Sequence, residues 1–261
     1  MPKEKPFILV SNDDGITAKG IRTLVEVMSE IGDVLVVAPD SPQSGMGHAI
    51  TIHTSLRINR SDIFGAQIEA YECSGTPADC IKLGKYYVKT DRMPDLVVSG
   101  INHGSNTSIS ILYSGTMSAA IEGAIEGTPA IGFSLCDYHK DADFSHTKEY
   151  IKKITLQVLQ TGLAKGIALN VNFPKIQEEP IKGIKICRQA RARWQDEFDE
   201  RTDPHGRKYL WAMGSFINHD LGHDTDEWAV KNNYISVVPS VFDLTAHRDI
   251  AVLNDEWEIL R

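Results

Sequence analysis

The chain of 261 residues is long enough to form one large α/β domain around its own hydrophobic core. Its 42% hydrophobic and 24% charged residues are typical of a soluble globular protein, and its formal net charge of -8 disfavours nucleic-acid binding, which needs lysine and arginine on the phosphates. No apolar run approaches the roughly 20 residues of a membrane-spanning helix, and the four cysteines form no CxxC pair, so we expect a cytoplasmic protein without membrane contacts.

The first 135 residues alternate short β-branched runs with segments of helical spacing. Residues 7–10 predict a buried strand, 16–31 an amphipathic helix and 33–38 a second strand. Strand, helix and strand at this spacing predict a parallel sheet with right-handed crossovers. The other expected elements are an antiparallel insertion (49–58 and 66–73), helices at 76–86, 114–126 and 146–163, and strands at 95–99, 129–135 and 168–173.

Residues 187–233 differ in composition from the rest of the chain. They are charged and aromatic, and Asp203-Pro204-His205-Gly206 is a turn signal between two arms. We therefore expect a projecting arm that contacts another subunit. The predicted fold is an α/β Rossmann-like three-layer sandwich with a mostly parallel sheet and a projecting C-terminal hairpin. It comprises a catalytic core at 1–186, an oligomerisation arm at 187–233, and a strand and helix at 234–261 that return to the core.

Side chains with oxygen atoms follow three of the expected parallel strands. Asp13 and Asp14 come after the first strand, and Ser44 follows the second. Asn102 follows the strand at 95–99. Because ligands bind at the carboxyl ends of the strands in a doubly wound sheet, these side chains should meet at one edge. Carboxylate, hydroxyl and amide oxygens suit a hard cation such as Mg²⁺ or Mn²⁺. The alternative is that one carboxylate caps the next helix and the other is solvated.

A second pattern points to phosphate. Ser114-Gly115-Thr116 opens the helix predicted up to residue 126. Free backbone N–H groups at a helix N-terminus, with two hydroxyls and a glycine that allows close approach, can bind an anion, although the pattern also fits an ordinary N-cap. A cation site and an anion site on one edge suggest metal-assisted phosphoryl transfer or hydrolysis. The chain lacks GxGxxG, GxxxxGK[ST], GxSxG and DxDx[TV], which disfavours dinucleotide-binding, P-loop, α/β-hydrolase and aspartyl-phosphate enzymes.

Five motifs occur in order between residues 7 and 134, and looser similarity continues to residue 246. The motifs are Ser11-Asn12-Asp13-Asp14-Gly15, Ala38-Pro39-Asp40…Gln43-Ser44, Gly75-Thr76-Pro77-Ala78-Asp79-Cys80, Val98-Ser99-Gly100-Ile101-Asn102…Gly104…Asn106 and Tyr113-Ser114-Gly115-Thr116. This combination resembles the survival protein SurE family, the stationary-phase 5′-nucleotidases. The resemblance implies a Rossmann-like phosphatase that needs a divalent metal and releases phosphate from nucleoside monophosphates, often 5′ and sometimes 3′.

The resemblance also implies a set of site residues and partners. The residues that match the metal ligands are Asp13, Asp14, Ser44 and Asn102. The residues that match positions near the bound phosphate are Asn106, Ser114, Gly115 and Thr116. The two aspartates are the expected catalytic residues, and one Mg²⁺ or Mn²⁺ is expected per subunit. The expected partners are a nucleoside monophosphate and further copies of the chain, because the family forms dimers or tetramers through exchanged C-terminal arms.

Two questions stay open at the level of the sequence. The general base could be Asp13 or His48, although a lone histidine in a glycine-rich loop is more often a structural hydrogen-bonding residue. His103 is assigned no role, because its position varies in the family. The alternative function is a non-catalytic, metal-dependent nucleotide or phosphate sensor on the same fold, and a glycosyltransferase is a weaker third reading.

Overall fold

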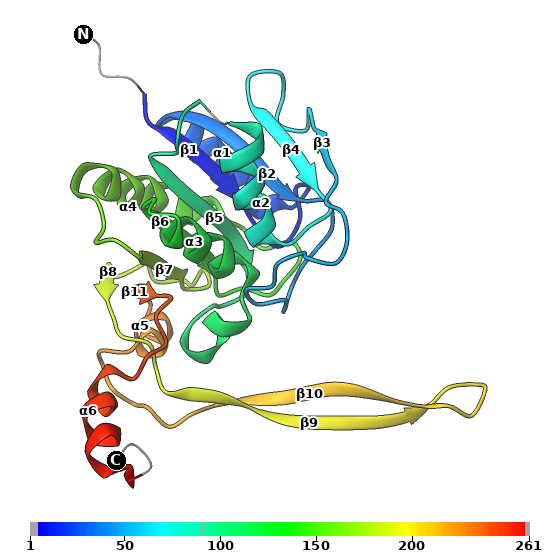
Figure 1. Cartoon of the computed structure of the whole chain (residues 1–261), viewed down its shortest axis with the longest axis vertical. Helices are drawn as coiled ribbons and strands as arrows, with labels where there is room; N and C mark the ends of the chain where they lie inside the picture. The colour runs from blue at the N-terminus through cyan, green and yellow to red at the C-terminus, as the bar shows by residue number, and fades with distance from the viewer. Residues whose placement is uncertain (1–4, 90, 259–261) are drawn as a thin grey trace.

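A nine-stranded sheet forms the centre of the computed structural model, which describes residues 5–89 and 91–258 (Figure 1). Residues 1–4 and 90 of the predicted core, and 259–261 of the predicted C-terminal return, lie outside this range. The strands of the sheet are β1 (Phe7–Ser11), β2 (Asp33–Pro39), β3 (Ile58–Arg60), β4 (Glu69–Cys73), β5 (Leu96–His103), β6 (Ala130–Leu135), β7 (Ile167–Phe173), β8 (Ile184–Ile186) and β11 (Ile235–Val241). The helices are α1 (Lys19–Ser29), α2 (Pro77–Leu83), α3 (Gly115–Ile125), α4 (Lys148–Thr161), α5 (Asp226–Lys231) and α6 (His247–Glu256).

The strand order is β3-β4-β2-β1-β5-β6-β7-β11-β8. Strands β4, β2, β1, β5, β6 and β7 pair in parallel, whereas β3 and β11 run antiparallel to β4 and β7. The chain moves outward from β1 to β2 and later returns to the other side of β1 as β5. Strand order therefore reverses between β1 and β5, where a doubly wound sheet forms its ligand crevice. The predicted mostly parallel α/β fold is confirmed.

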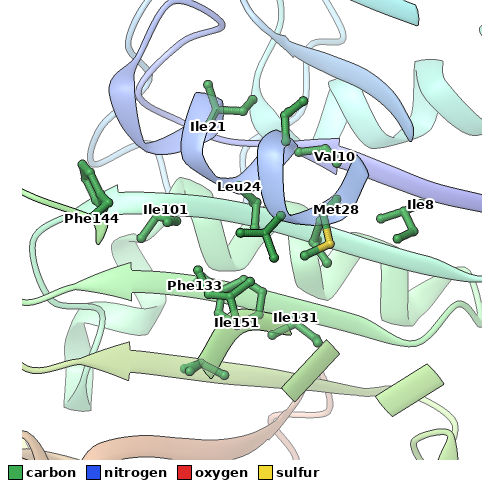
Figure 2. Packing of buried hydrophobic residues seen from close by; sticks show 14 of the residues in the cluster. Ile8, Val10, Ile21, Leu24, Met28, Ile101, Ile131, Phe133, Phe144 and Ile151 are labelled. Carbon is green, nitrogen blue, oxygen red and sulfur yellow. The ribbon is translucent and has the colours of Figure 1, made fainter. Parts of the chain in front are cut away.

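Helices cover both faces of the sheet, which produces the three layers. Alternate residues of a strand face opposite sides, so Ile8 and Val10 of β1 join one core while Phe7 and Leu9 join the other. Residues of α1 and α4 complete the first core, and residues of α2 and α3 complete the second. Figure 2 shows the first core, where Leu24 reaches from α1 toward the sheet. Each buried side chain of this kind stabilises the fold by about 1.5–3 kcal/mol.

The predicted strand at 49–58 is wrong over most of its length. Only β3 at its end pairs antiparallel with β4, as the predicted insertion required. The preceding residues instead run past α2, where the backbone N–H and hydroxyl of Thr51 donate hydrogen bonds to the Asp79 carboxylate. Thr76 donates from its hydroxyl to the Ala49 carbonyl. Hydrogen bonds to side chains at the start of α2 thus replace the backbone hydrogen bonds that a strand would make in this segment.

Strand β5 extends to His103, beyond the predicted end at residue 99. Its pairing with β6 shifts register between Ser99 and Asn102. A β-carbon on Gly100, at φ +125°, would lie 2.3 Å from the Phe133 carbonyl oxygen, so only glycine fits the shifted strand. Such irregularities re-aim the residues that follow them. Asn102 therefore belongs to the end of the strand itself and not to a loop after it.

Strands β9 (Ala192–Thr202) and β10 (Lys208–Asn218) form a separate antiparallel hairpin that projects from the core (Figure 1). The predicted turn is present, since the Gly206 N–H donates to the Asp203 carbonyl. Beyond β11, α6 has no buried residue. Across the described ranges, no helix combines the length and the apolar character required to cross a membrane.

Candidate functional site

Three elements meet at Asp13, which follows β1 at its carboxyl end. The backbone N–H of Gln43, in the loop after β2, donates to the Asp13 carbonyl at 2.7 Å. The Thr116 hydroxyl, in the first turn of α3, donates to Asp13 Oδ1. Asp13 is only 4% exposed. Its carboxylate is thus buried at the reversal point of the sheet and held by α3.

Within the described residues, the carboxylates of Asp13 and Asp14 have no lysine or arginine beside them. Burial and the neighbouring Asp14 raise the pKa of Asp13 from 3.8 to about 6, while the hydroxyl and backbone N–H of Thr116 act in the opposite direction. Among the described residues, no lysine or arginine forms an ion pair with either aspartate, and His103 is the basic side chain beside Asp14. Two adjacent carboxylates with no lysine or arginine partner among the described residues suit a bound cation, which would favour their ionised forms.

Asp14 is tied to the end of β5 through His103. The His103 backbone N–H donates to Asp14 Oδ2 at 3.2 Å, and His103 Nδ1 lies 3.3 Å from the same oxygen. The Phe144 and His103 rings pack in a T-shaped arrangement with their centroids 4.8 Å apart. Asn102 donates from Nδ2 to the Gly104 carbonyl at 2.9 Å, which directs its amide nitrogen into its own loop. Sequence reasoning gave His103 no role, yet it fixes Asp14 beside Asn102.

Ser44 is exposed, and backbone hydrogen bonds hold its loop in place before and after it. Gln43 binds the Asp13 carbonyl, and the Gly47 N–H donates to the Tyr113 carbonyl at 3.1 Å. The loop therefore spans from Asp13 to Tyr113, two residues before α3. The structure brings the Ser44 loop, the two aspartates and Asn102 to one sheet edge, and their role as metal ligands remains a prediction.

The donor set at this edge fits a hard cation. Within residues 5–89 and 91–258, no group of three or more His, Cys, Asp or Glu side chains is arranged to hold a metal. The available donors are two carboxylates, an amide and a hydroxyl. All of them are oxygen ligands, which suit Mg²⁺ or Mn²⁺ better than a soft metal.

The N-terminus of α3 contacts the side chain of Asp13 directly. Ser114 is its N-cap, and its hydroxyl oxygen accepts the Met117 N–H at 3.0 Å. A β-carbon on Gly115 would lie 2.5 Å from the Asp13 β-carbon. The Thr116 hydroxyl is bound to Asp13, so the hydroxyls of both residues already have partners. The helix end, with its positive dipole, remains suited to an anion beside the carboxylates.

Asn106 is held by a buried polar network that the sequence analysis missed. Its backbone N–H donates to Asn172 Oδ1, and its side-chain Nδ2 donates to Ser134 Oγ, both at 2.8 Å. Asn170 donates from Nδ2 to the Asn106 carbonyl at 2.8 Å. The signal was present in β7, where two asparagines alternate with apolar residues in a buried strand and must share one face.

The residues after Asn106 are fastened to the base of the hairpin. The Asp226 carboxylate, 1% exposed at the start of α5, accepts the backbone N–H groups of Ser108, Ala190 and Glu227 at 2.8, 2.9 and 2.8 Å. The Ser108 hydroxyl donates to the Ala190 carbonyl at 2.8 Å. The position of Asn106 thus depends on α5 and on the segment that enters the hairpin.

Replacing Asp226 with asparagine should lower the free energy of unfolding by about 1–3 kcal/mol, because an amide NH₂ would face a buried N–H donor. Urea unfolding of the full chain measures the change. Asp224→Asn is the matched control. Asp224 is exposed and pairs with Arg188, and such surface pairs contribute at most about 1 kcal/mol. Equal, small changes in both variants would contradict the structural role of Asp226.

Comparisons with known proteins agree with this architecture. The profile of the family described as Survival protein SurE matches residues 8–196. The 5′-nucleotidase SurE of Cytophaga hutchinsonii is 67% identical over 256 residues, covering 98% of each chain. The 5′-nucleotidase SurE of Bacteroides thetaiotaomicron is 46% identical over 261 residues, covering 97% of each. The crystal structure of the SurE protein from Aquifex aeolicus superposes with a TM-score of 0.82 at 37% identity, covering 96% of this chain and 99% of that one.

Proposed function

Because the chain belongs to the survival protein SurE family, we propose that it is a metal-dependent 5′-nucleotidase that hydrolyses nucleoside monophosphates to nucleoside and phosphate. The observation that carries the proposal is the meeting of the Asp13–Asp14 pair, which has no lysine or arginine partner among the described residues, with the N-terminus of α3 at Asp13. One feature suits a cation and the other an anion, and a phosphate bound through a metal needs both. Activity toward 3′-nucleotides belongs to the same proposal.

In this proposal, the residues that hold one Mg²⁺ or Mn²⁺ are Asp13, Asp14, Ser44 and Asn102. A cation bound there would neutralise phosphate charge and lower the pKa of a bound water. The side chain of Asn106 and the backbone at Ser114, Gly115 and Thr116 hold the phosphate oxygens.

Two aspartates have distinct tasks in the proposed reaction. Asp13, oriented by the Thr116 hydroxyl, takes the proton of the attacking water. Asp14, fixed by His103, keeps its carboxylate beside Asn102. This scheme assigns the base to Asp13 and not to His48, whose Nε2 lies 2.8 Å from Glu122 Oε2.

Phosphate release from AMP tests the function. With Mn²⁺ or Mg²⁺ present, inorganic phosphate should accumulate, and EDTA should stop the reaction until excess metal is restored. The product is measured by a colorimetric phosphate assay, and 3′-AMP is run in parallel. Tight metal-dependent binding of AMP without phosphate release would support the alternative, a nucleotide sensor, and would contradict the enzyme.

We also propose that the chain assembles as a homodimer or homotetramer through its C-terminal arm. The support is the exposure of large apolar side chains along the hairpin, such as Phe198 at 66% and Trp211 at 57%. Exposed apolar surface of this kind marks an interaction site. A cytoplasmic location and the absence of nucleic-acid or membrane partners are part of the proposal, supported by four free cysteines and a net charge of -8.

A further inference from the structure

A groove of about 480 Å³ opens beside Ser114, the N-cap of α3. One wall follows α3 and the turn before it, and the other is formed by residues 187–189 and 238–244. Most of the lining is apolar, including Ile111, Ile121 and Phe242. The groove therefore begins at the proposed phosphate position and offers an apolar surface of the size and character that bind a small organic group.

His48 is a polar side chain in this lining that is held in a fixed position. Its Nε2 lies 2.8 Å from Oε2 of Glu122, a residue of α3 that is 3% exposed. Lys82 Nζ lies 2.5 Å from the other Glu122 oxygen. Burial alone would raise the pKa of Glu122, but its hydrogen bonds to His48 and Lys82 bring the pKa below its usual value. The ionised Glu122 thus orients the His48 ring, whose side chain is 33% exposed.

Ser118 supplies a second polar group in the same lining. It stands one helical turn from Ser114 and one turn from Glu122, so the three residues share one face of α3. The Ser118 hydroxyl is buried and has no hydrogen-bond partner in the described part of the chain. Buried hydroxyls normally have a partner, so this one suits the polar group of a ligand.

We propose that this groove binds the nucleoside half of the substrate, with His48 and Ser118 hydrogen-bonded to the sugar hydroxyls. The inference rests on the proposed nucleotidase function and adds a determinant of specificity. With phosphate at the N-terminus of α3, the sugar follows along the helix past Ser118, and the base contacts the apolar walls. Glu122 acts as a positioning residue through His48. A site built to hydrogen-bond a hydroxyl discriminates against the substrate that lacks it.

Three substrates distinguish a sugar contact of His48 from a part in the phosphate chemistry. They are AMP, 2′-deoxy-AMP and p-nitrophenyl phosphate, which has no sugar. The unmodified chain should prefer AMP over 2′-deoxy-AMP in kcat/KM. His48→Ala should lower kcat/KM for AMP by about tenfold, the equivalent of one good hydrogen bond, mainly through KM. The AMP preference should collapse, while p-nitrophenyl phosphate hydrolysis stays within about twofold because it makes no sugar contact.

Two further variants test the sugar contact of Ser118 and the positioning of His48 by Glu122. Ser118→Ala should reduce the AMP preference in the same way. Glu122→Gln should do so without adding to the effect of His48→Ala, because the two residues act as one unit. The matched control is His53→Gln, an exposed histidine of the same segment whose change should leave all three substrates unaffected.

Two results would overturn the inference. If His48→Ala lowers kcat/KM equally for AMP and p-nitrophenyl phosphate, His48 takes part in the phosphate chemistry. If it leaves the preference for AMP over 2′-deoxy-AMP unchanged, His48 does not contact the sugar and the groove is not its binding site. Should the unmodified chain release no phosphate at all, the proposed function fails separately. Calorimetric binding of AMP and 2′-deoxy-AMP in the presence of Mn²⁺, with and without His48→Ala, then decides the sugar contact alone.

Discussion

Asp13→Asn is expected to reduce metal-dependent phosphate release from AMP by at least about a hundredfold, since it removes metal binding and water activation together. Asparagine has the size of aspartate and keeps an oxygen that can accept the Thr116 hydroxyl, so the loop after β1 should keep its structure. What is lost is one negative charge beside Asp14. Initial rates at limiting and saturating Mn²⁺ measure the effect, and saturating metal should not restore the rate.

Stability separates a chemical effect from a folding defect. Burial and Asp14 disfavour ionised Asp13, which raises its pKa to about 6, so Asp13→Asn should unfold at the same or a higher urea concentration in metal-free buffer. The control is Asp62→Asn, which makes the same substitution at an exposed aspartate between β3 and β4, away from the site. Full activity of Asp13→Asn under limiting metal would remove Asp13 from the site.

The fold was predictable where local pattern and tertiary packing agree. The runs that became β1 and β2 are buried on both faces, and the helix between them repeats its apolar residues at helical spacing. The prediction for residues 49–57 was wrong because their alternating pattern resembles a strand. Their path is set instead by hydrogen bonds to Thr76 and Asp79 at the start of α2. Such contacts depend on residues that are distant in the sequence, which local periodicity does not report.

The candidate site was predictable in its outline and not in its supporting contacts. Asp13, Asp14 and Asn102 could be selected because ligands bind at the carboxyl ends of parallel strands, and these ends can be located from the sequence. The partner of Asn106 lies 66 residues away at Asn172, and no spacing rule links the two. Thr116 was expected near the phosphate from its place at the helix start, but its hydroxyl is bound to Asp13. Long-range hydrogen bonds of this kind appear only in three dimensions.

Gly115→Ala is the second change with a large expected effect, because α3 approaches Asp13 without room for a methyl group. The added carbon would lie 2.5 Å from the Asp13 β-carbon and 3.0 Å from Asp13 Oδ2. Either the carboxylate or the first turn of α3 must move. A displacement of about 1 Å in a catalytic arrangement can reduce the rate on the order of a hundredfold, which is the loss we expect in kcat for AMP.

Helix propensity makes this prediction sharper. Alanine is favoured over glycine in a helix interior by up to about 1 kcal/mol, which at this first residue of α3 offsets only part of the cost of the displacement, so the rate should fall far more than the unfolding midpoint. Thr116→Ser is the control: it changes the next residue, keeps the hydroxyl that binds Asp13 and should retain most of the activity. A Gly115→Ala variant as active as the unmodified chain would show that the start of α3 does not set the position of Asp13.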